Sequence, residues 1–451
     1  MPAASPLLPI AADHPGSLAA QLTTIEGRDV VLVEVGTQER RGALSEADGR
    51  TFAAAALHAL QAGIPLLGVL ASSGADVHDG VAALHGWGLA AHALSRCSGR
   101  VPILLAATGP VLSGPALLLG LADQVVMTED AHAFVSGPRM VETFTGEALD
   151  ANELGGASVH ASSTGVAALV VPDRDAALRA LSDLVAYLPG TVDEEPPRWW
   201  TQDPVDRPTP EAGERIPASP TGGYDVRDVA RSIVDDGDLL ELRARWAPNL
   251  VTALATIGGR PVGVVANQPV SIAGTLDIPA SQKGARFVAF CDAFGLPLLT
   301  LIDTPGFYPG KDLEWRGMIR HGAQLAFAYA RATVPRVAVV LRKAYGGAYI
   351  VMDCRAMGSD LYLAWPSAEI AVMGAKGAVE VLHRRETPER RTELEKEYEA
   401  RFLNPYVAAD RGAVDAVIDP VDTRREVSAA FEMLSTKREQ LVARKHDNTP
   451  L

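Results

Sequence analysis

The pattern of apolar and polar residues along this 451-residue chain alternates between short apolar runs and longer amphipathic stretches. Residues 337–341 form an unbroken run of Val, Ala and Leu, which is typical of a strand buried on both faces of a sheet. The same pattern in the first half predicts strands at 29–35, 65–70, 101–107 and 124–127, and helices at 46–62, 80–96, within 109–121 and at 174–187. This alternation predicts a layered α/β fold whose ligands bind where strands end and helices begin.

The second half of the chain repeats the first. Segment 25–33 resembles segment 257–265, and segment 63–67 resembles segment 295–299, both 232 residues apart; Gly114 falls opposite Gly347 at 233, and Asp123 opposite Asp360 at 237. The offset between matching positions rises from 232 to 237 along the chain, as insertions in loops would cause. We therefore expect a tandem duplication of one α/β unit. The expected division is a lead-in at 1–23, a first domain at 24–190, a Pro-rich linker at 191–223, a second domain at 224–437 and a tail at 438–451.

A glycine-containing junction follows the apolar run of the second half. Its residues are Ala344-Tyr-Gly-Gly-Ala348, with the start of a helix predicted at Tyr349. Adjacent glycines let the backbone turn tightly, and the first amides of a helix lack intrahelical acceptors. Such amides stabilise a developing oxyanion by roughly 3–4 kcal/mol per donor. The alternative is a turn that serves packing alone, but a corresponding turn at 109–115 in the first copy favours a pair of oxyanion sites.

Composition and charge narrow the class of protein. A formal charge of −14 and a pI near 5.2 argue against nucleic-acid or anionic-membrane partners. The N-terminus lacks the pattern of a signal peptide, and no apolar run reaches the length of a membrane span. The three cysteines are far apart, which argues against disulfides and a zinc ribbon. We therefore expect a cytoplasmic protein.

Side chains that could carry chemistry are few. His78, His85 and His92 recur every seven residues, a spacing that favours one face of a helix over a metal site, so no metal is expected. Asp303 follows a predicted strand and is either a functional carboxylate or the cap of a turn. Arg342 and Lys343 either meet an anionic ligand or are solvated charges. Because no acid–base pair is visible, backbone donors would carry the catalysis of an enzyme built this way.

Several motifs occur in register and carry a family resemblance. In the second half they are 264–269 (VVANQP), 273–278 (AGTLDI), 281–287 (SQKGARF), 303–307 (DTPGF), 342–349 (RKAYGGAY), 363–366 (LAWP), 371–375 (AVMGA), 404–409 (NPYVAA) and 414–418 (VDAVI). In the first half, segments 137–147, 153–157 and 163–166 fit the same pattern. Over residues 25–437 the chain resembles the carboxyltransferase (β) subunit of biotin-dependent acyl-CoA carboxylases, of the propionyl-CoA carboxylase type.

The resemblance implies two tandem crotonase-like domains, the first for acyl-CoA and the second for carboxybiotin. It also implies a hexamer built as a ring of dimers, with each active site between the first domain of one chain and the second domain of another. Biotin would sit on a separate partner, a biotin carboxylase and carrier α subunit, and no lysine of this chain has the Met-Lys-Met context of a biotin acceptor.

The resemblance also assigns residues to roles. The amides of Gly347 and Ala348, with Gly346 shaping the turn, would hold the ureido oxygen of biotin, and Ala344, Tyr345 and Tyr349 would lie on the cofactor side. Ser113 and Gly114 would form the second oxyanion hole, for the thioester oxygen. Ile350, Ser73, Gly74 and Gly137 would contact the acyl-CoA, and an aliphatic residue at 350 indicates a broad acetyl/propionyl preference.

The first half departs from the family pattern. Ser113 replaces a glycine, Pro115 replaces an alanine and has no N–H, and Asp76 stands where an arginine is expected. The expected function is carboxyl transfer from carboxybiotin to a short-chain acyl-CoA. The alternatives are a non-catalytic assembly subunit that keeps the fold, and a biotin-linked decarboxylase.

Overall fold

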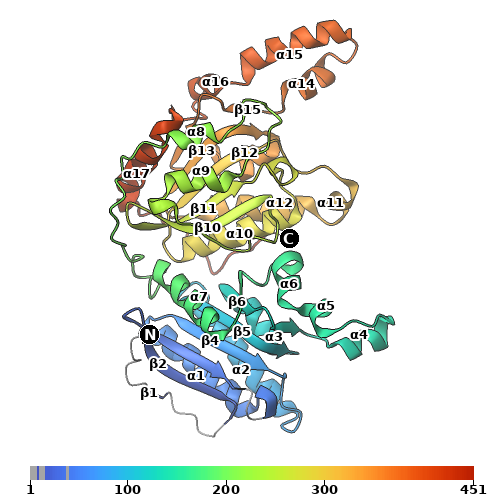
Figure 1. The fold of residues 1–451 in the computed structure, drawn as a ribbon, viewed down its shortest axis with the longest axis vertical. Coiled ribbons are helices and arrows are strands. Elements are labelled where there is room, and N and C mark those ends of the chain that lie inside the picture. The colour runs from blue at the N-terminus through green and yellow to red at the C-terminus, as the bar shows by residue number, and fades with distance from the viewer. Residues whose placement is uncertain (1–7, 10–15, 37–39, 451) are drawn as a thin grey trace. The chain divides into compact units, whose positions relative to one another are not determined.

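The computed structural model describes residues 8–9, 16–36 and 40–450. Its contacts divide the chain into two compact units, Met1–Pro197 and Arg198–Leu451 (Figure 1). The boundary between the units lies inside the segment 191–223 that the sequence predicts as a linker. Each unit is a sheet covered by helices, so the predicted α/β class is confirmed.

The sheet of the first unit is parallel except at one edge. Strands β3, β4, β5, β6 and β8 run parallel, while β1 and β2 join antiparallel next to β3, and β7 pairs with the end of β5. The strands are β1 (Leu8–Pro9), β2 (Leu18–Ile25), β3 (Arg28–Val35), β4 (Leu66–Ser72), β5 (Ile103–Leu112), β6 (Gln124–Thr128), β7 (His132–Phe134) and β8 (Leu169–Val171). The four strands predicted for this half are all present, with shifted ends.

Strand β2 crosses the expected boundary between the lead-in at 1–23 and the first domain at 24–190. It pairs with β3 along its whole length, from Leu18 opposite Val35 to Ile25 opposite Arg28. Leu18 and Ala20 are buried while Ala19 between them is exposed, the alternation of a strand with one covered face. Leu8–Pro9 also lies in this sheet, and the rest of the first fifteen residues lies outside the described part of the chain.

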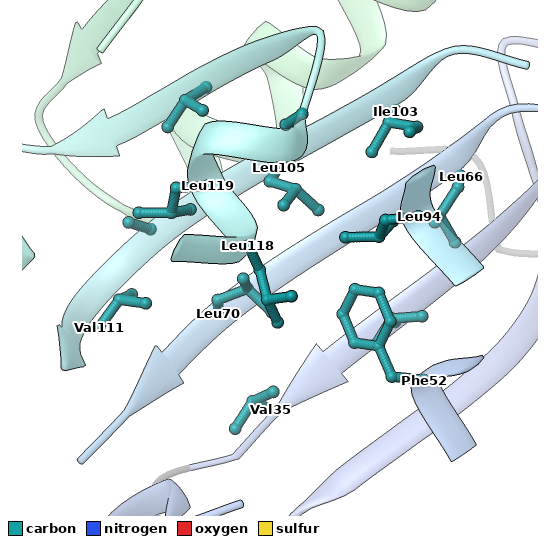
Figure 2. Close-up of a cluster of buried hydrophobic side chains, with 14 of the residues drawn as sticks. Val35, Phe52, Leu66, Leu70, Leu94, Ile103, Leu105, Val111, Leu118 and Leu119 are labelled. Atoms are coloured by element: carbon teal, nitrogen blue, oxygen red, sulfur yellow. The ribbon is translucent and has the colours of Figure 1, made fainter. Parts of the chain in front are cut away.

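Helices cover both faces of the first sheet. Figure 2 shows one face, where Phe52 of α1, Leu94 of α2 and Leu118 of α3 pack with Leu70 and Ile103 of the strands. Helix α7 covers the other face. The helices are η1 (Arg40–Gly42), α1 (Glu46–Ala62), α2 (Val81–Cys97), α3 (Ala116–Leu121), α4 (Pro138–Thr145), α5 (Ala151–Gly155), α6 (Ala157–Val159), the π-helix η2 (His160–Thr164) and α7 (Arg174–Tyr187).

The second unit repeats the sheet topology of the first. Its order β9-β10-β11-β12-β13-β14-β16, with β15 against the end of β13, matches that of β1 to β8 strand for strand. The strands are β9 (Leu240–Glu241), β10 (Leu250–Ile257), β11 (Arg260–Asn267), β12 (Leu298–Thr304), β13 (Arg336–Tyr345), β14 (Leu361–Ala364), β15 (Glu369–Ala371) and β16 (Ala416–Val417). Single hydrogen bonds repeat as well: Asp123 accepts the Ile103 amide, and Asp360 accepts the Arg336 amide. The internal duplication is therefore visible at the level of single contacts.

Helices α10 and α12 cover one face of the second sheet, and α9 and α17 pack on the other. Helix α15 contributes no buried residue and extends away from the sheet (Figure 1). The helices are α8 (Pro210–Glu214), α9 (Val226–Ile233), η3 (Asp235–Gly237), η4 (Ile272–Gly274), α10 (Ile278–Ala293), α11 (Lys311–Trp315), α12 (Met318–Arg331), α13 (Gly346–Val351), η5 (Arg355–Met357), α14 (Ala375–Leu382), α15 (Pro388–Phe402), α16 (Pro405–Asp410), η6 (Pro420–Asp422), α17 (Thr423–Met433) and η7 (Leu434–Thr436).

Much of the predicted linker is bound to the second unit. The fully buried Arg424 donates to the carbonyl oxygens of Asp203 and Pro204, and Thr209 donates its amide to Val421. Residues 198–223 therefore form part of the folded second unit, although their sequence shows no periodicity. Their backbone carbonyls are held by side chains that lie more than 200 residues away.

Candidate active site

The junction between β13 and α13 contains the glycine pair that the sequence analysis singles out. β13 ends at Tyr345, and Gly346 takes a left-handed conformation with a φ of 57°. A Cβ at Gly346 would lie 3.1 Å from the carbonyl oxygen of Val372, so both conformation and space favour glycine. The chain passes here from strand to helix within a single residue.

The backbone N–H groups of Gly347 and Ala348 are the unpaired donors of this junction. Both lie in the first turn of α13, where amides have no acceptor inside the helix. Neither donates a hydrogen bond to any residue that the structure describes. Two adjacent unpaired amides at the positive end of a helix can hold an oxygen that gathers negative charge.

A cavity of about 730 Å³ lies beside these donors. Its walls come from the junction, the end of β15, helices α14, α15 and α16 and the loop that follows α16. It is lined by Gly346, Gly347, Tyr349, Ile350, Ile370, Ala371, Val372, Leu382, Tyr398, Phe402, Val407, Ala408, Arg411 and Ala413. Because most of this wall is aliphatic or aromatic, the cavity suits a compact, largely apolar ligand with an oxygen acceptor.

Of the residues predicted around the β13–α13 junction, two line the cavity and two do not. Tyr349 and Ile350 line the cavity together with the glycines, and burial raises the pKa of Tyr349 to about 12, so its hydroxyl stays neutral. Ala344 and Tyr345 are buried and do not line it. The Tyr345 side chain instead packs against Ala375 and its hydroxyl donates to Glu369.

Part of the cavity wall lies far from the glycine junction in sequence and was not predicted. Tyr398 and Phe402 of α15 and Arg411 after α16 line the cavity but lie about 50 residues or more beyond the glycine junction. Asp303 was expected to be either a functional carboxylate or the cap of a turn. It is buried at the end of β12 and does not line the cavity. Burial raises the pKa of the Asp303 carboxyl, and the Arg342 guanidinium opposes that rise.

The corresponding junction of the first unit has fewer free donors. Ser113 takes the same left-handed conformation as Gly346, with a φ of 61°, a region that costs a non-glycine residue about 1–2 kcal/mol. Its amide is already used, since it donates to the carbonyl oxygen of Phe134 at 2.9 Å. Pro115, the counterpart of Ala348, has no N–H. No residue in the described part of the chain accepts the Gly114 amide, so Gly114 is the one residue of 113–115 with a free donor, and Ser113 supplies none.

The surroundings of the first junction are closely packed. A Cβ at Gly74 would lie 3.3 Å from the Ser113 Cβ, and a Cβ at Gly114 would lie 3.4 Å from Nε1 of Trp87. That indole nitrogen is buried and has no hydrogen-bond partner among the described residues. Gly74 and Gly114 thus both lie against side chains at this junction.

The other predicted acyl-CoA residues lie around the same unit. Ser73 donates its amide to Arg41 and is exposed, and Gly137 caps the start of α4. Asp76 is buried, accepts the amide of His78 and pairs with Arg40, contacts that lower its pKa, the bond from His78 most of all. The charge of the unexpected acid at 76 is therefore compensated by Arg40, whose side chain is 62% exposed.

The first unit contains a separate cavity of about 470 Å³ at the ends of β3, β4 and β5. Glu34 and Arg174, which form an ion pair, line it together with Thr108. None of the first-unit residues predicted for the site lines this cavity. It is therefore distinct from the Ser113 junction.

Among the residues that the structure describes, no three His, Cys, Asp or Glu side chains gather as they would around a metal ion. Over the same residues, no helix is both long enough and apolar enough to cross a membrane.

Known proteins of the same architecture cover almost the whole chain. The Propionibacterium freudenreichii protein named methylmalonyl-CoA carboxyltransferase 12S subunit is 45% identical over 433 residues, 95% of this chain and 82% of that protein. A Saccharopolyspora erythraea propionyl-CoA carboxylase beta chain is 43% identical over 450 residues, which cover 95% of this chain and 82% of that protein. A Propionigenium modestum methylmalonyl-CoA decarboxylase subunit alpha is 40% identical over 434 residues, which cover 95% of this chain and 84% of that protein.

A solved structure agrees with these relatives. The transcarboxylase 12S crystal structure, described as a hexamer assembly with methylmalonyl-coenzyme A and methylmalonic acid bound, superposes with a TM-score of 0.95 at 44% identity, covering 96% of this chain and 85% of that one. The family model described as carboxyl transferase domain matches residues 13–449. The resemblance read from the motifs is thereby confirmed, and this chain belongs to the carboxyl transferase domain family.

Proposed function

We propose that this chain is the carboxyltransferase subunit of a biotin-dependent acyl-CoA carboxylase. It would move a carboxyl group from carboxybiotin to the α-carbon of a short-chain acyl-CoA of the acetyl or propionyl type. The observation that carries the proposal is the pair of unpaired amides at Gly347 and Ala348 beside a 730 Å³ cavity, in a chain of this family.

The hydrogen-bond donors and the apolar cavity of the second unit suit a biotin group. Biotin, carried on a partner protein, supplies the carboxyl group and a nitrogen that accepts the α-proton. The amides of Gly347 and Ala348 would donate to its ureido oxygen, and the apolar wall that includes Tyr349 and Val372 would cover its fused rings. Ala344 and Tyr345 would support the junction from beneath, since both are buried.

The first unit would hold the acyl-CoA. The free amide of Gly114 would donate to the thioester oxygen while the α-carbon loses its proton, beside Ser113 and Gly74. Ser73 and Gly137 would contact the coenzyme A part. Ile350 belongs to the second unit and lines the cavity there, with 47% of its surface exposed. In the proposed assembly the first unit of one chain would bring its acyl-CoA to the second unit of another, so Ile350 would contact the acyl group.

The proposed assembly follows the relatives. The 12S transcarboxylase is described as a hexamer, and we propose a hexamer of this chain as well. A biotin carboxylase and carrier subunit is the proposed partner, because the curated relatives include propionyl-CoA carboxylase beta chains.

Two other functions have an observation in their favour. A relative named methylmalonyl-CoA decarboxylase subunit alpha, 40% identical, favours a biotin-linked decarboxylase. The single free amide at residues 113–115 favours a non-catalytic assembly subunit. Both keep the fold and the cavity of the second unit, so activity measurements must separate the three.

The test is a panel of carboxylated acyl-CoA thioesters with free biotin. The purified chain should release CO2 from malonyl-CoA or methylmalonyl-CoA only when biotin is added. With the biotin-carboxylating partner and labelled bicarbonate, it should also carboxylate acetyl-CoA or propionyl-CoA. Release without the forward reaction would identify a decarboxylase. No reaction with any thioester, while the chain still binds its partner, would identify an assembly subunit and contradict the proposal.

A further inference from the structure

The Asp303 carboxylate collects three hydrogen bonds at the end of β12. The Tyr224 hydroxyl donates to Oδ2 at 2.8 Å, Arg342 Nε donates to Oδ2 at 3.0 Å, and the Lys343 amide donates to Oδ1 at 3.1 Å. The side chain of Asp303 is 2% exposed and that of Arg342 is 9% exposed, so this ion pair is almost fully removed from water. A buried pair of this kind depends on complete hydrogen bonding, which these contacts supply.

The network extends to a segment that the sequence predicts as linker. Arg342 Nη1 donates to the carbonyl oxygens of Ser219, at 3.3 Å, and Gly222, at 2.9 Å. Lys343 Nζ donates to the carbonyl oxygen of Pro220 at 2.5 Å. Segment 219–222 is therefore fastened to the end of β13 through its backbone.

The network lies immediately before the free amides. The ladder between β12 and β13 changes register between Ile302 and Thr304, where the Lys343 amide bonds to the Asp303 carboxylate. Two residues after Lys343 the strand ends at Tyr345, and Gly346 starts α13. The position of Asp303 therefore fixes the point from which the Gly346–Ala348 turn departs.

We propose that Asp303 is a positioning residue for the Gly346–Ala348 turn, with Arg342 locking segment 219–222 to the same point. The inference rests on the proposed function, because it assigns the turn a ligand oxygen to hold. Asp303 does not line the cavity, so it acts through the turn. Displacing catalytic donors by about 1 Å can cost about 100-fold in rate.

Substitutions at Asp303 separate positioning from folding. Asp303→Ala removes the acceptor of the Lys343 amide, whereas Asp303→Asn keeps an oxygen that can accept it. We expect kcat for biotin-dependent CO2 release to fall about 100-fold in Asp303→Ala and less than 10-fold in Asp303→Asn, with KM for the acyl-CoA unchanged within about threefold. Both variants should lose similar thermal stability, since both leave Arg342 without its carboxylate.

Asp235→Ala is the matched control. Asp235 is equally buried, pairs with Arg424 and accepts the amides of Gly258 and Gly259 at the turn between β10 and β11, away from the strand end that carries Asp303. It should lower stability but leave kcat of the folded enzyme within about twofold. Equal kcat values for Asp303→Ala and Asp235→Ala would overturn the proposal.

Two measurements keep the test decisive if Asp303→Ala does not fold. Arg342→Lys retains the charge but loses the bonds to segment 219–222, so kcat should fall at least fivefold; an unchanged kcat would overturn the proposal. Hydrogen exchange of peptide 343–352 needs no substrate and should quicken in Asp303→Asn or Arg342→Lys but not in Asp235→Ala. If this exchange changes while the wild-type chain has no activity, the proposed function fails and the positioning holds.

Discussion

Ser113 and Gly346 occupy equivalent positions in the two units and share a left-handed backbone, with φ values of 61° and 57°. What differs is the donor two residues later. Ala348 offers a free N–H, while Pro115 has none. A single proline therefore separates a junction with two unpaired donors from one with a single donor at Gly114.

Pro115→Ala should restore the missing donor. If position 115 donates to the thioester oxygen, we expect kcat to rise by about 10- to 100-fold, since one oxyanion donor is worth about 10²–10³ in rate in other enzymes. The measurement is steady-state release of CO2 from methylmalonyl-CoA with added biotin. A rate within twofold of wild type would show that Gly114 alone serves this unit, and Ala116→Gly is a control outside the junction.

We propose that Ile350 influences acyl preference, because it lines the cavity and is 47% exposed. Ile350→Asp replaces the aliphatic contact with a carboxylate, so the ratio of kcat/KM for propionyl-CoA over acetyl-CoA should change by about 10-fold, the scale of one methylene in a pocket. Ile350→Val is the matched aliphatic control and should change the ratio by less than threefold. An unchanged ratio in the Asp variant would remove Ile350 from the acyl site.

At the scale of elements, the regular parts of the fold were predictable and the irregular parts were not. The unbroken apolar run of β13 is typical of a buried strand. The amphipathic pattern of α1 and the Ser45 cap before it are typical of a helix. β2 was missed because Leu18 and Ala20 are the two buried residues among its eight, so its pairing with β3 decides its structure. The segment 191–223 was predicted as a linker because it shows no periodicity, and the bonds from Arg424 to the carbonyl oxygens of Asp203 and Pro204 leave no trace in the sequence.

The candidate site was predictable to a similar extent. The glycine pair, Tyr349 and Ile350 are adjacent in sequence and were found together. Tyr398 and Phe402 lie on a helix with no buried residue and reach the cavity only through the path of the chain after β15. Tyr345 was placed on the cofactor side, but the structure buries its side chain against Ala375.

The cap of α9 gives a pH-dependent prediction. Asp225 caps this helix and pairs with Arg227, a contact that lowers the pKa of Asp225 to about 2, opposed by desolvation and helped by Gln268. Because the pKa of Asp225 is lower in the folded state than in the unfolded chain, its negative charge stabilises the folded protein fully above about pH 4. This stabilisation is lost as the pH falls toward 2.

Asp225→Asn keeps a capping oxygen but removes the charge. We expect its thermal midpoint to lie about 2–4 °C below wild type at pH 6, corresponding to about 1 kcal/mol after allowance for solvent screening. The difference should shrink between about pH 4 and pH 2. Differential scanning calorimetry across this range checks it; a difference independent of pH would show that the charge contributes nothing.

At the scale of the whole molecule, the duplication explains why one chain carries two junctions of the same design. The proposed hexamer predicts a particle of six times the 47.5 kDa of one chain at micromolar concentration. Sedimentation equilibrium measures this mass without calibration. A monomer throughout that range would contradict the proposed assembly.

The central claim is that the free amides of Gly347 and Ala348 carry the reaction. Ala348→Pro tests it most directly, because it deletes one N–H, and Pro115 shows that this position of the fold accommodates proline. The measurement is kcat for biotin-dependent release of CO2 from methylmalonyl-CoA, beside circular dichroism to confirm folding. We expect kcat to fall by about 10²–10³ in a folded protein. A folded Ala348→Pro variant with the wild-type kcat would contradict it.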